Sequence, residues 1–103
     1  MSKVSYVVKM RAQPGKRDDL LAGLADLVKE IADEEGTELY IFHADDNDPD
    51  AVWSYEIFRD ADAVAIHQAN QGVAAFGDTL GPLLDGAPEP IRLRPVVGKG
   101  FTP

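Results

Sequence analysis

Apolar residues repeat along this chain with two different periods, and the switches between these periods define the predicted elements. In Lys3–Met10 every second residue is apolar, which is typical of a strand. In the segment from Lys16 to about Glu34, leucine, isoleucine and valine recur three or four residues apart, a spacing that predicts an amphipathic helix. Pro14-Gly15 predicts a turn between the two segments. Gly36 is the expected end of the helix.

Two further predicted strands, Glu38–Ala44 and Ala51–Phe58, are nearly continuous in apolar residues. Such runs indicate strands that are covered on both faces. The acidic, turn-rich residues 45–50 between them predict an antiparallel pair. Asp60 can then cap a helix that contains His67 and continues, after a break around residues 70–72, toward Phe76.

The C-terminal part predicts a short helical piece at Thr79–Leu84, a last strand at Ile91–Val97 and an extended tail at Gly98–Pro103. The order strand, helix, strand, strand, helix, strand predicts a ferredoxin-like α+β domain, a four-stranded antiparallel sheet with helices on one face. The length of 103 residues suits one such domain, residues 1–103. Because helices cover one face while the strands are apolar on both, we expect a homodimer packed sheet to sheet.

The charge balance narrows the class of function. Ten Lys and Arg against eighteen Asp and Glu give a net charge of −8, which argues against a nucleic-acid partner. The absence of cysteine excludes disulfides, thiolate metal sites and cysteine nucleophiles. Charged residues interrupt the first twenty positions, and no run of apolar residues is long enough for a membrane span. We therefore expect a cytoplasmic protein without a membrane partner.

Motifs for metals and phosphates do not match. The acidic residues 45–50 lack the glycine and the final glutamate that a calcium loop needs at the required spacing, so a solvated hairpin loop is the better interpretation. His43 and His67, the two histidines, stand on different elements without the spacing of a zinc motif. The glycines match neither a dinucleotide loop nor a P-loop. We therefore expect no metal site.

Glu56 and His67 carry the strongest signal for chemistry. Glu56 interrupts an aromatic strand where a carboxylate is rarely placed without a partner. It stands about 10 Å from the end of its strand, and His67 stands about 10 Å into the returning helix, so the two side chains come level if Glu56 faces the helices. Asn70 and small residues share the helical face of His67 and leave room for a ligand. A structural pair of buried, hydrogen-bonded groups is the alternative.

Other candidates have equally plain alternatives. Arg92 and Arg94 alternate on the last strand and could bind an anion, or they could pair with surface carboxylates. The aromatic residues are more often core than pocket, although their polar tips favour a lined cavity. This set comprises Tyr6, Tyr40, Phe42, Trp53, Tyr55 and Phe58.

Several segments together resemble the antibiotic biosynthesis monooxygenase family of dimeric α+β barrels. They are Ala12–Arg17 before the leucine-rich helix, Glu34–Tyr40, the Asp48-Pro49 turn, and Trp53–Asp60 with Ala63 and His67 following. The resemblance implies a ferredoxin-like protomer, a dimer with facing sheets, and a pocket between sheet and helices. For characterised members it also implies insertion of oxygen into phenols or quinols without flavin, haem or metal, so no cofactor is expected.

The resemblance also assigns roles to residues. A substrate that supplies its own electrons needs a base, an apolar cavity and a group that holds the anion. Histidine changes charge near neutral pH, which suits His67 as the proton acceptor, and Glu56 could orient it. Phe42, Trp53 and Tyr55 would stack against an aromatic ring, subject to the face that each takes.

Departures from the family leave alternatives open. A haem-degrading branch uses an asparagine on the first strand, and Lys3–Met10 contains none, so haem degradation is not expected. A relative that handles a small phosphorylated dione would favour an isomerase that uses Arg92 or Arg94. A noncatalytic dimer that binds a small hydrophobic molecule is the third hypothesis.

Overall fold

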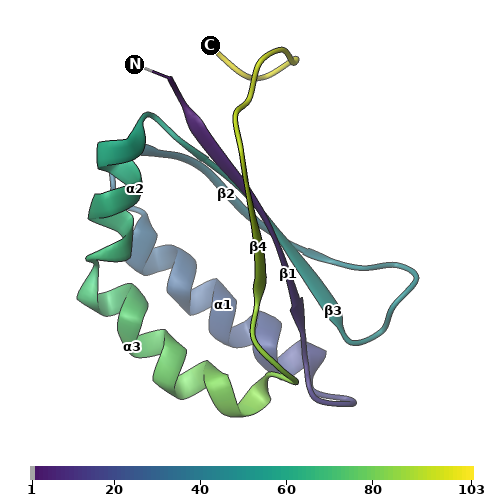
Figure 1. Cartoon of the computed structure of the whole chain (residues 1–103). Helices are drawn as coiled ribbons and strands as arrows, with labels where there is room; N and C mark the ends of the chain where they lie inside the picture. The colour runs from purple at the N-terminus through teal and green to yellow at the C-terminus, as the bar shows by residue number, and fades with distance from the viewer. Residues whose placement is uncertain (1) are drawn as a thin grey trace.

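The computed structural model describes residues 2–103 as one antiparallel sheet with its helices on a single face (Figure 1). The elements follow one another as β1 (Val4–Arg11), α1 (Arg17–Ile31), β2 (Thr37–Ala44), β3 (Ala51–Phe58), α2 (Ala61–Gln68), α3 (Gln71–Leu80), a 3₁₀ turn (Gly81–Leu83) and β4 (Glu89–Leu93). This is the expected ferredoxin-like α+β fold. No helix in the described part is long and apolar enough to cross a membrane.

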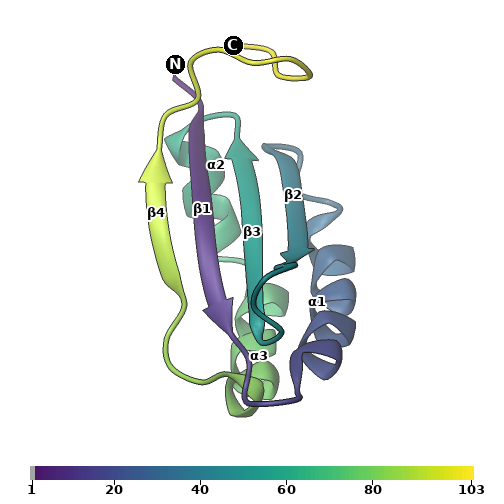
Figure 2. The ribbon, with the colours of Figure 1, turned by 90° about the vertical axis from the view of Figure 1, so that its right-hand side faces the viewer.

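The sheet has the order β2-β3-β1-β4, so β2 and β4 are its edges (Figure 2). Glu56 lies at the centre of the sheet, because it pairs with Tyr6 of β1 on one side and with Tyr40 of β2 on the other. Residues directly opposite each other in an antiparallel pair point to the same face. These three side chains therefore share one face with the helices.

Alternation along β3 separates the two faces. Val52, Ser54, Glu56 and Phe58 are all buried beneath the helices. The α1 and α3 helices cover one end of this face with a leucine-rich core, and α2 covers the other end, where Val4, Phe58, Ala63 and Val64 pack together. The two cores flank the polar residues of the middle.

The opposite face of the sheet carries no helix (Figure 1). It presents apolar side chains from several strands, namely Ile41 (43% exposed), Tyr55 (47%), Ile91 (54%) and Leu93 (47%). The expectation that the strands are apolar on both faces is therefore met. The described chain itself leaves this face open.

The C-terminal segment departs from the expected boundaries. The last strand is Glu89–Leu93 rather than Ile91–Val97, and Val97 is 91% exposed. Leu93 pairs with Ser5 close to the start of β1, and Pro95 has no amide hydrogen to extend the ladder. Pro90 is tolerated within β4 because this strand is an edge. The tail bends at Gly100 rather than staying extended, and the Phe101 ring lies 5.6 Å from Lys3 Nζ.

Candidate functional site

A hollow of about 210 Å³ lies between the middle of the sheet and α2. Glu56 and Tyr6 contribute from the sheet, His67 and Gln68 from α2, and Pro90 from the edge strand. The remaining lining residues are Val8, Phe58 and Val64. The carboxylate and the imidazole that the sequence places level with each other thus line one cavity.

Glu56 is buried at 6% exposure in the floor of this hollow. Ser54 donates a hydrogen bond from its hydroxyl to Glu56 Oε2 over 2.7 Å. Burial raises the pKa of Glu56 above its ordinary value, although the bond from Ser54 and the nearby His67 act in the opposite direction. Glu56 is thus a carboxyl group that takes up a proton more readily than an exposed one.

His67 is held by a carboxylate other than the expected one. The α2 helix is fixed at its start by Asp60, whose Oδ1 accepts the Ala63 amide over 2.8 Å. In the last turn of α2, His67 Nδ1 lies 2.9 Å from Glu34 Oε1. The expectation that Glu56 orients His67 is therefore wrong. Glu34 reaches the ring from the turn between α1 and β2, whereas Glu56 bonds to Ser54 on its own strand.

Three donors converge on the Glu34 carboxylate. Besides His67, the Thr37 hydroxyl donates to Oε1 over 2.7 Å and Asn70 Nδ2 donates to Oε2 over 2.7 Å. The Glu34 side chain is only 7% exposed. Burial acts to raise the pKa of Glu34, but the bonds from Asn70, Thr37 and His67 outweigh it and hold the pKa below its usual range. Glu34 is accordingly an ionised acceptor at neutral pH.

An ionised carboxylate has no proton to donate, so the hydrogen between Glu34 and His67 belongs to Nδ1. In the neutral ring Nε2 then carries the lone pair. Nε2 has no hydrogen-bond partner among residues 2–103, and it is not among their buried, unpaired atoms. A molecule in the hollow therefore lies against an imidazole whose Nδ1 edge is fixed by Glu34.

Comparison with known proteins identifies the family of this chain. The family model described as antibiotic biosynthesis monooxygenase matches residues 4–79. The chain belongs to this family. It is 30% identical to a candidate antibiotic biosynthesis monooxygenase from Chloroflexus aurantiacus, with a TM-score of 0.82 over 98% of this chain and 100% of that one.

Two other solved structures show the same fold at lower identity. A candidate family member from Caulobacter crescentus is 24% identical, with a TM-score of 0.88 over 93% of this chain and 92% of its own. A protein from Pseudomonas aeruginosa is also 24% identical, with a TM-score of 0.84 over 94% and 97%. A search of proteins with curated functions finds no match.

The aromatic residues expected to stack on a substrate divide between the two faces of the sheet in this family member. Phe42 faces the helices and packs 5.3 Å from Tyr40, beside the α1 core. Trp53 and Tyr55 face the opposite side, where Trp53 Nε1 donates to Asp45 and Tyr55 packs 4.3 Å from His43. Within one chain the last two do not reach the hollow, because odd positions of β3 point away from Glu56.

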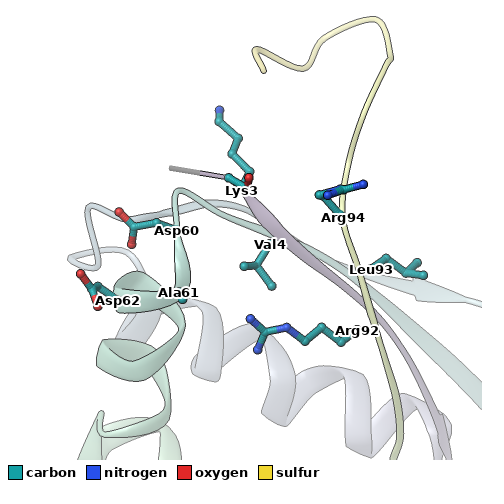
Figure 3. A pocket seen from close by; sticks show the side chains of 9 residues that line it. Lys3, Val4, Asp60, Ala61, Asp62, Arg92, Leu93 and Arg94 are labelled. Atoms are coloured by element: carbon teal, nitrogen blue, oxygen red, sulfur yellow. The ribbon is translucent and has the colours of Figure 1, made fainter.

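Asn70 and Arg92 take positions beside the hollow rather than in its lining. Asn70 bonds to Glu34 through its amide nitrogen, and its Oδ1 accepts from the amides of Gly72 and Val73, which caps α3. Arg92 projects from β4 toward the helices, whereas its neighbour Leu93 points away from them (Figure 3). The Arg92 guanidinium donates to the Tyr6 hydroxyl over 3.2 Å.

A second, larger cavity of about 460 Å³ adjoins β4 and the start of α2. Its lining includes the basic residues Lys3, Arg92 and Arg94 and the acidic residues Asp60 and Asp62. Figure 3 shows Arg92 reaching from β4 toward the helices, whereas the Lys3 side chain extends away from Asp60 and Asp62. Among residues 2–103 no cluster of three or more His, Asp or Glu side chains is arranged to hold a metal ion.

Glu34 is a functional candidate that the sequence analysis does not single out, since it lies only within Glu34–Tyr40, one of the segments that carry the family resemblance. A physical signal was present. Asp33, Glu34 and Glu35 follow the last turn of α1, where the negative end of the helix dipole disfavours carboxylates. A carboxylate at such a position suggests a partner elsewhere in the fold, and His67 is that partner.

Proposed function

We propose that this protein is a cofactor-independent monooxygenase that oxidises a small electron-rich aromatic, such as a phenol or quinol, with dioxygen. The observation that carries this proposal is the Glu34–His67 pair, in which Glu34 holds Nδ1 of an imidazole that lines the hollow together with Glu56. Membership of the antibiotic biosynthesis monooxygenase family supports it.

The first step needs only a base. His67 Nε2 removes the hydroxyl proton of the phenol, and the electron pair left on the ring makes it a reductant. Charge delocalised on the ring is compatible with the apolar walls made by Val8, Phe58 and Val64. The Glu34 carboxylate stabilises the imidazolium that forms, in the way that a buried acid supports the histidine of a hydrolase triad.

The second step consumes dioxygen and balances without another reductant. The ring anion transfers its electrons to dioxygen, a C–O bond forms at a ring carbon, and the proton on His67 completes a hydroperoxide. The O–O bond then breaks. One oxygen remains as a carbonyl, and the other leaves as water with a proton from Glu56, while His67 takes the hydrogen of that carbon. A phenol and dioxygen thus give a quinone and water.

Oxygen uptake with a panel of phenols and quinols tests this proposal. We expect the wild type to consume oxygen and His67→Ala to fall by about 10²-fold or more, the usual contribution of a general base. His43→Ala is the matched control, because His43 stacks on Tyr55 away from the hollow. Equal rates for the wild type and His67→Ala would remove His67 from the mechanism, and no uptake across the panel would refute the enzyme.

One observation favours a second candidate, an isomerase of a small phosphorylated carbonyl compound. The cavity beside the hollow is lined by Arg92 and Arg94, which could hold a phosphate, although Asp60 and Asp62 also line it and Lys3 pairs with Glu38. This candidate predicts that Arg92→Ala and Arg94→Ala weaken phosphate-dependent binding. Retained ligand binding without any turnover would instead support a noncatalytic binding protein.

We further propose that two chains pair through the open face of the sheet. Apolar residues from β2, β3 and β4 are about half exposed there, an arrangement that is costly in water and typical of an interface. His43 Nε2 is buried on this side without a hydrogen-bond partner in the described residues. A second chain would cover the apolar residues and could supply that partner.

A further inference from the structure

Tyr6 lines the hollow, and the proposed mechanism gives it no role. It stands on β1 directly opposite Glu56 on one side and Arg92 on the other. Its ring packs edge-on against Phe58, with centroids 6.2 Å apart and planes at 85°. The hydroxyl is thus carried by a ring that its neighbours hold in place.

The Tyr6 hydroxyl accepts a hydrogen bond, but its own hydrogen has no acceptor within the described chain. Arg92 Nη1 donates to the Tyr6 oxygen over 3.2 Å. A guanidinium has donors only and cannot accept, so the hydroxyl's own hydrogen is not used in this contact. No acceptor for that hydrogen occurs among the side-chain hydrogen bonds of residues 2–103. Tyr6 therefore has a donor left for a ligand.

Arg92 also brings an uncompensated charge. Its guanidinium carbon lies 5.9 Å from the centre of the Tyr6 ring, and no carboxylate pairs with it within the described chain. A positive group that donates to a hydroxyl polarises the O–H bond and strengthens that hydroxyl as a donor. The arrangement favours negative charge on an oxygen placed at the hydroxyl.

We propose that Tyr6, polarised by Arg92, donates a hydrogen bond to the substrate oxygen from which His67 removes the proton. The O–H bond breaks, its hydrogen passes to His67 Nε2, and the electron pair stays on the oxygen, which accepts the Tyr6 hydrogen. This deepens the proposed function, because it rests on the same hollow and base. The proton transfer itself requires no oxidant.

The volume of the hollow favours a small substrate. A cavity of about 150 Å³ accommodates benzene, and this one measures about 210 Å³. It has room for one ring with a small substituent. We therefore assign the site to a single ring that bears an acidic hydroxyl, with any larger substituent extending toward the second cavity beside Arg92.

Binding of para-nitrophenol without dioxygen tests the assignment, because the ionised form of this probe absorbs at longer wavelength than the neutral form. We expect the wild type to bind the ionised form preferentially, and Tyr6→Phe to weaken that binding by about 10- to 100-fold. Arg92→Gln should weaken it by a smaller factor. Tyr55→Phe is the matched control, because Tyr55 lies on the opposite face of the sheet, and it should bind as the wild type does.

The neutral analogue para-nitrotoluene separates donation from packing. Its binding should change by less than about twofold in Tyr6→Phe, because only the hydroxyl is removed. The assignment is overturned if Tyr6→Phe binds the ionised probe as the wild type does, if it loses both compounds equally, or if the wild type does not favour the ionised form. Oxygen uptake with the panel of phenols and quinols keeps the two proposals separate, since preferential binding of the ionised probe without uptake across that panel would refute the monooxygenase alone.

Discussion

Replacing Glu34 with glutamine tests whether this carboxylate organises the site. The substitution keeps the size of the side chain and removes its charge and one of its two acceptor oxygens. Thr37 and His67 both use Oε1, whereas Asn70 uses Oε2. If the glutamine oxygen takes the first two bonds, its amide group faces the Asn70 amide, and two donors meet.

Asn70 cannot relieve this contact between two donors without losing another hydrogen bond. Turning its amide would bring its oxygen toward residue 34, but that oxygen accepts from the Gly72 and Val73 amides at the start of α3. The variant therefore loses one bond to a charged group and the charge on two others, or it loses the helix cap. Either outcome corresponds to about 2–4 kcal/mol of unfolding free energy.

Urea unfolding of Glu34→Gln as a function of pH checks this value. Because the pKa of Glu34 is lowered in the folded state, its stabilising contribution is fully present above the unfolded value of 4.5. The contribution disappears as the pH falls through the folded pKa. The difference between variant and wild type should therefore shrink as the pH falls below 4.5.

Glu35→Gln is the matched control, since Glu35 is the exposed neighbour and carries the same charge. It should change the unfolding free energy by less than about 0.5 kcal/mol. The same two proteins test the chemistry, where Glu34→Gln should lower kcat by about 10²-fold because the Nδ1 hydrogen is no longer fixed. A stability difference that equals that of Glu35→Gln, or one that does not change with pH, would refute the reasoning.

Three further predictions concern other parts of the fold. Glu56→Gln should stabilise the protein at neutral pH in urea unfolding, because the raised pKa of Glu56 means that its ionisation above that pKa favours the unfolded state; an unchanged or lower midpoint would contradict this. Gly36→Ala should lose about 1–3 kcal/mol in thermal unfolding, since its new Cβ would lie 2.5 Å from Ala63 Cβ. Ile41→Lys should convert a dimer into an 11.2 kDa monomer in sedimentation velocity, while Ile66→Lys, an exposed position on α2, should not.

The sequence predicted those elements whose boundaries depend on local signals. The strand Ala51–Phe58 has the predicted bounds, and the break at residues 70–72 separates α2 from α3 because the Asn70 side chain caps a new helix. The last strand was misplaced by its apolar pattern. The extent of the strand depends on where β1 begins and on Pro95. A pattern of apolar residues contains no information on either constraint.

The candidate site was predictable to the extent that it depends on periodicity. Glu56 and His67 line one hollow because each position follows from counting residues along a strand and a helix. The contact between Glu34 and His67 joins residues thirty-three positions apart. It depends on how the end of α1 packs beside α2, and periodicity does not determine that packing. Burial and hydrogen bonding of Glu34 become visible only in the folded chain.

The alternation of side chains along β3 places the proposed catalytic site and the proposed dimer interface on opposite faces of the sheet. Even positions of β3 place Glu56 beneath the helices with His67, and odd positions place Trp53 and Tyr55 on the open face. A shift of one residue in the register of β3 would exchange these sets, burying the indole beneath the helices and exposing the carboxylate. The proposed chemistry and the proposed pairing of two chains therefore depend on the same ladder. A variant that disturbs this register should lose both the oxidation activity and the pairing of chains. Ile41→Lys should lose only the pairing of chains.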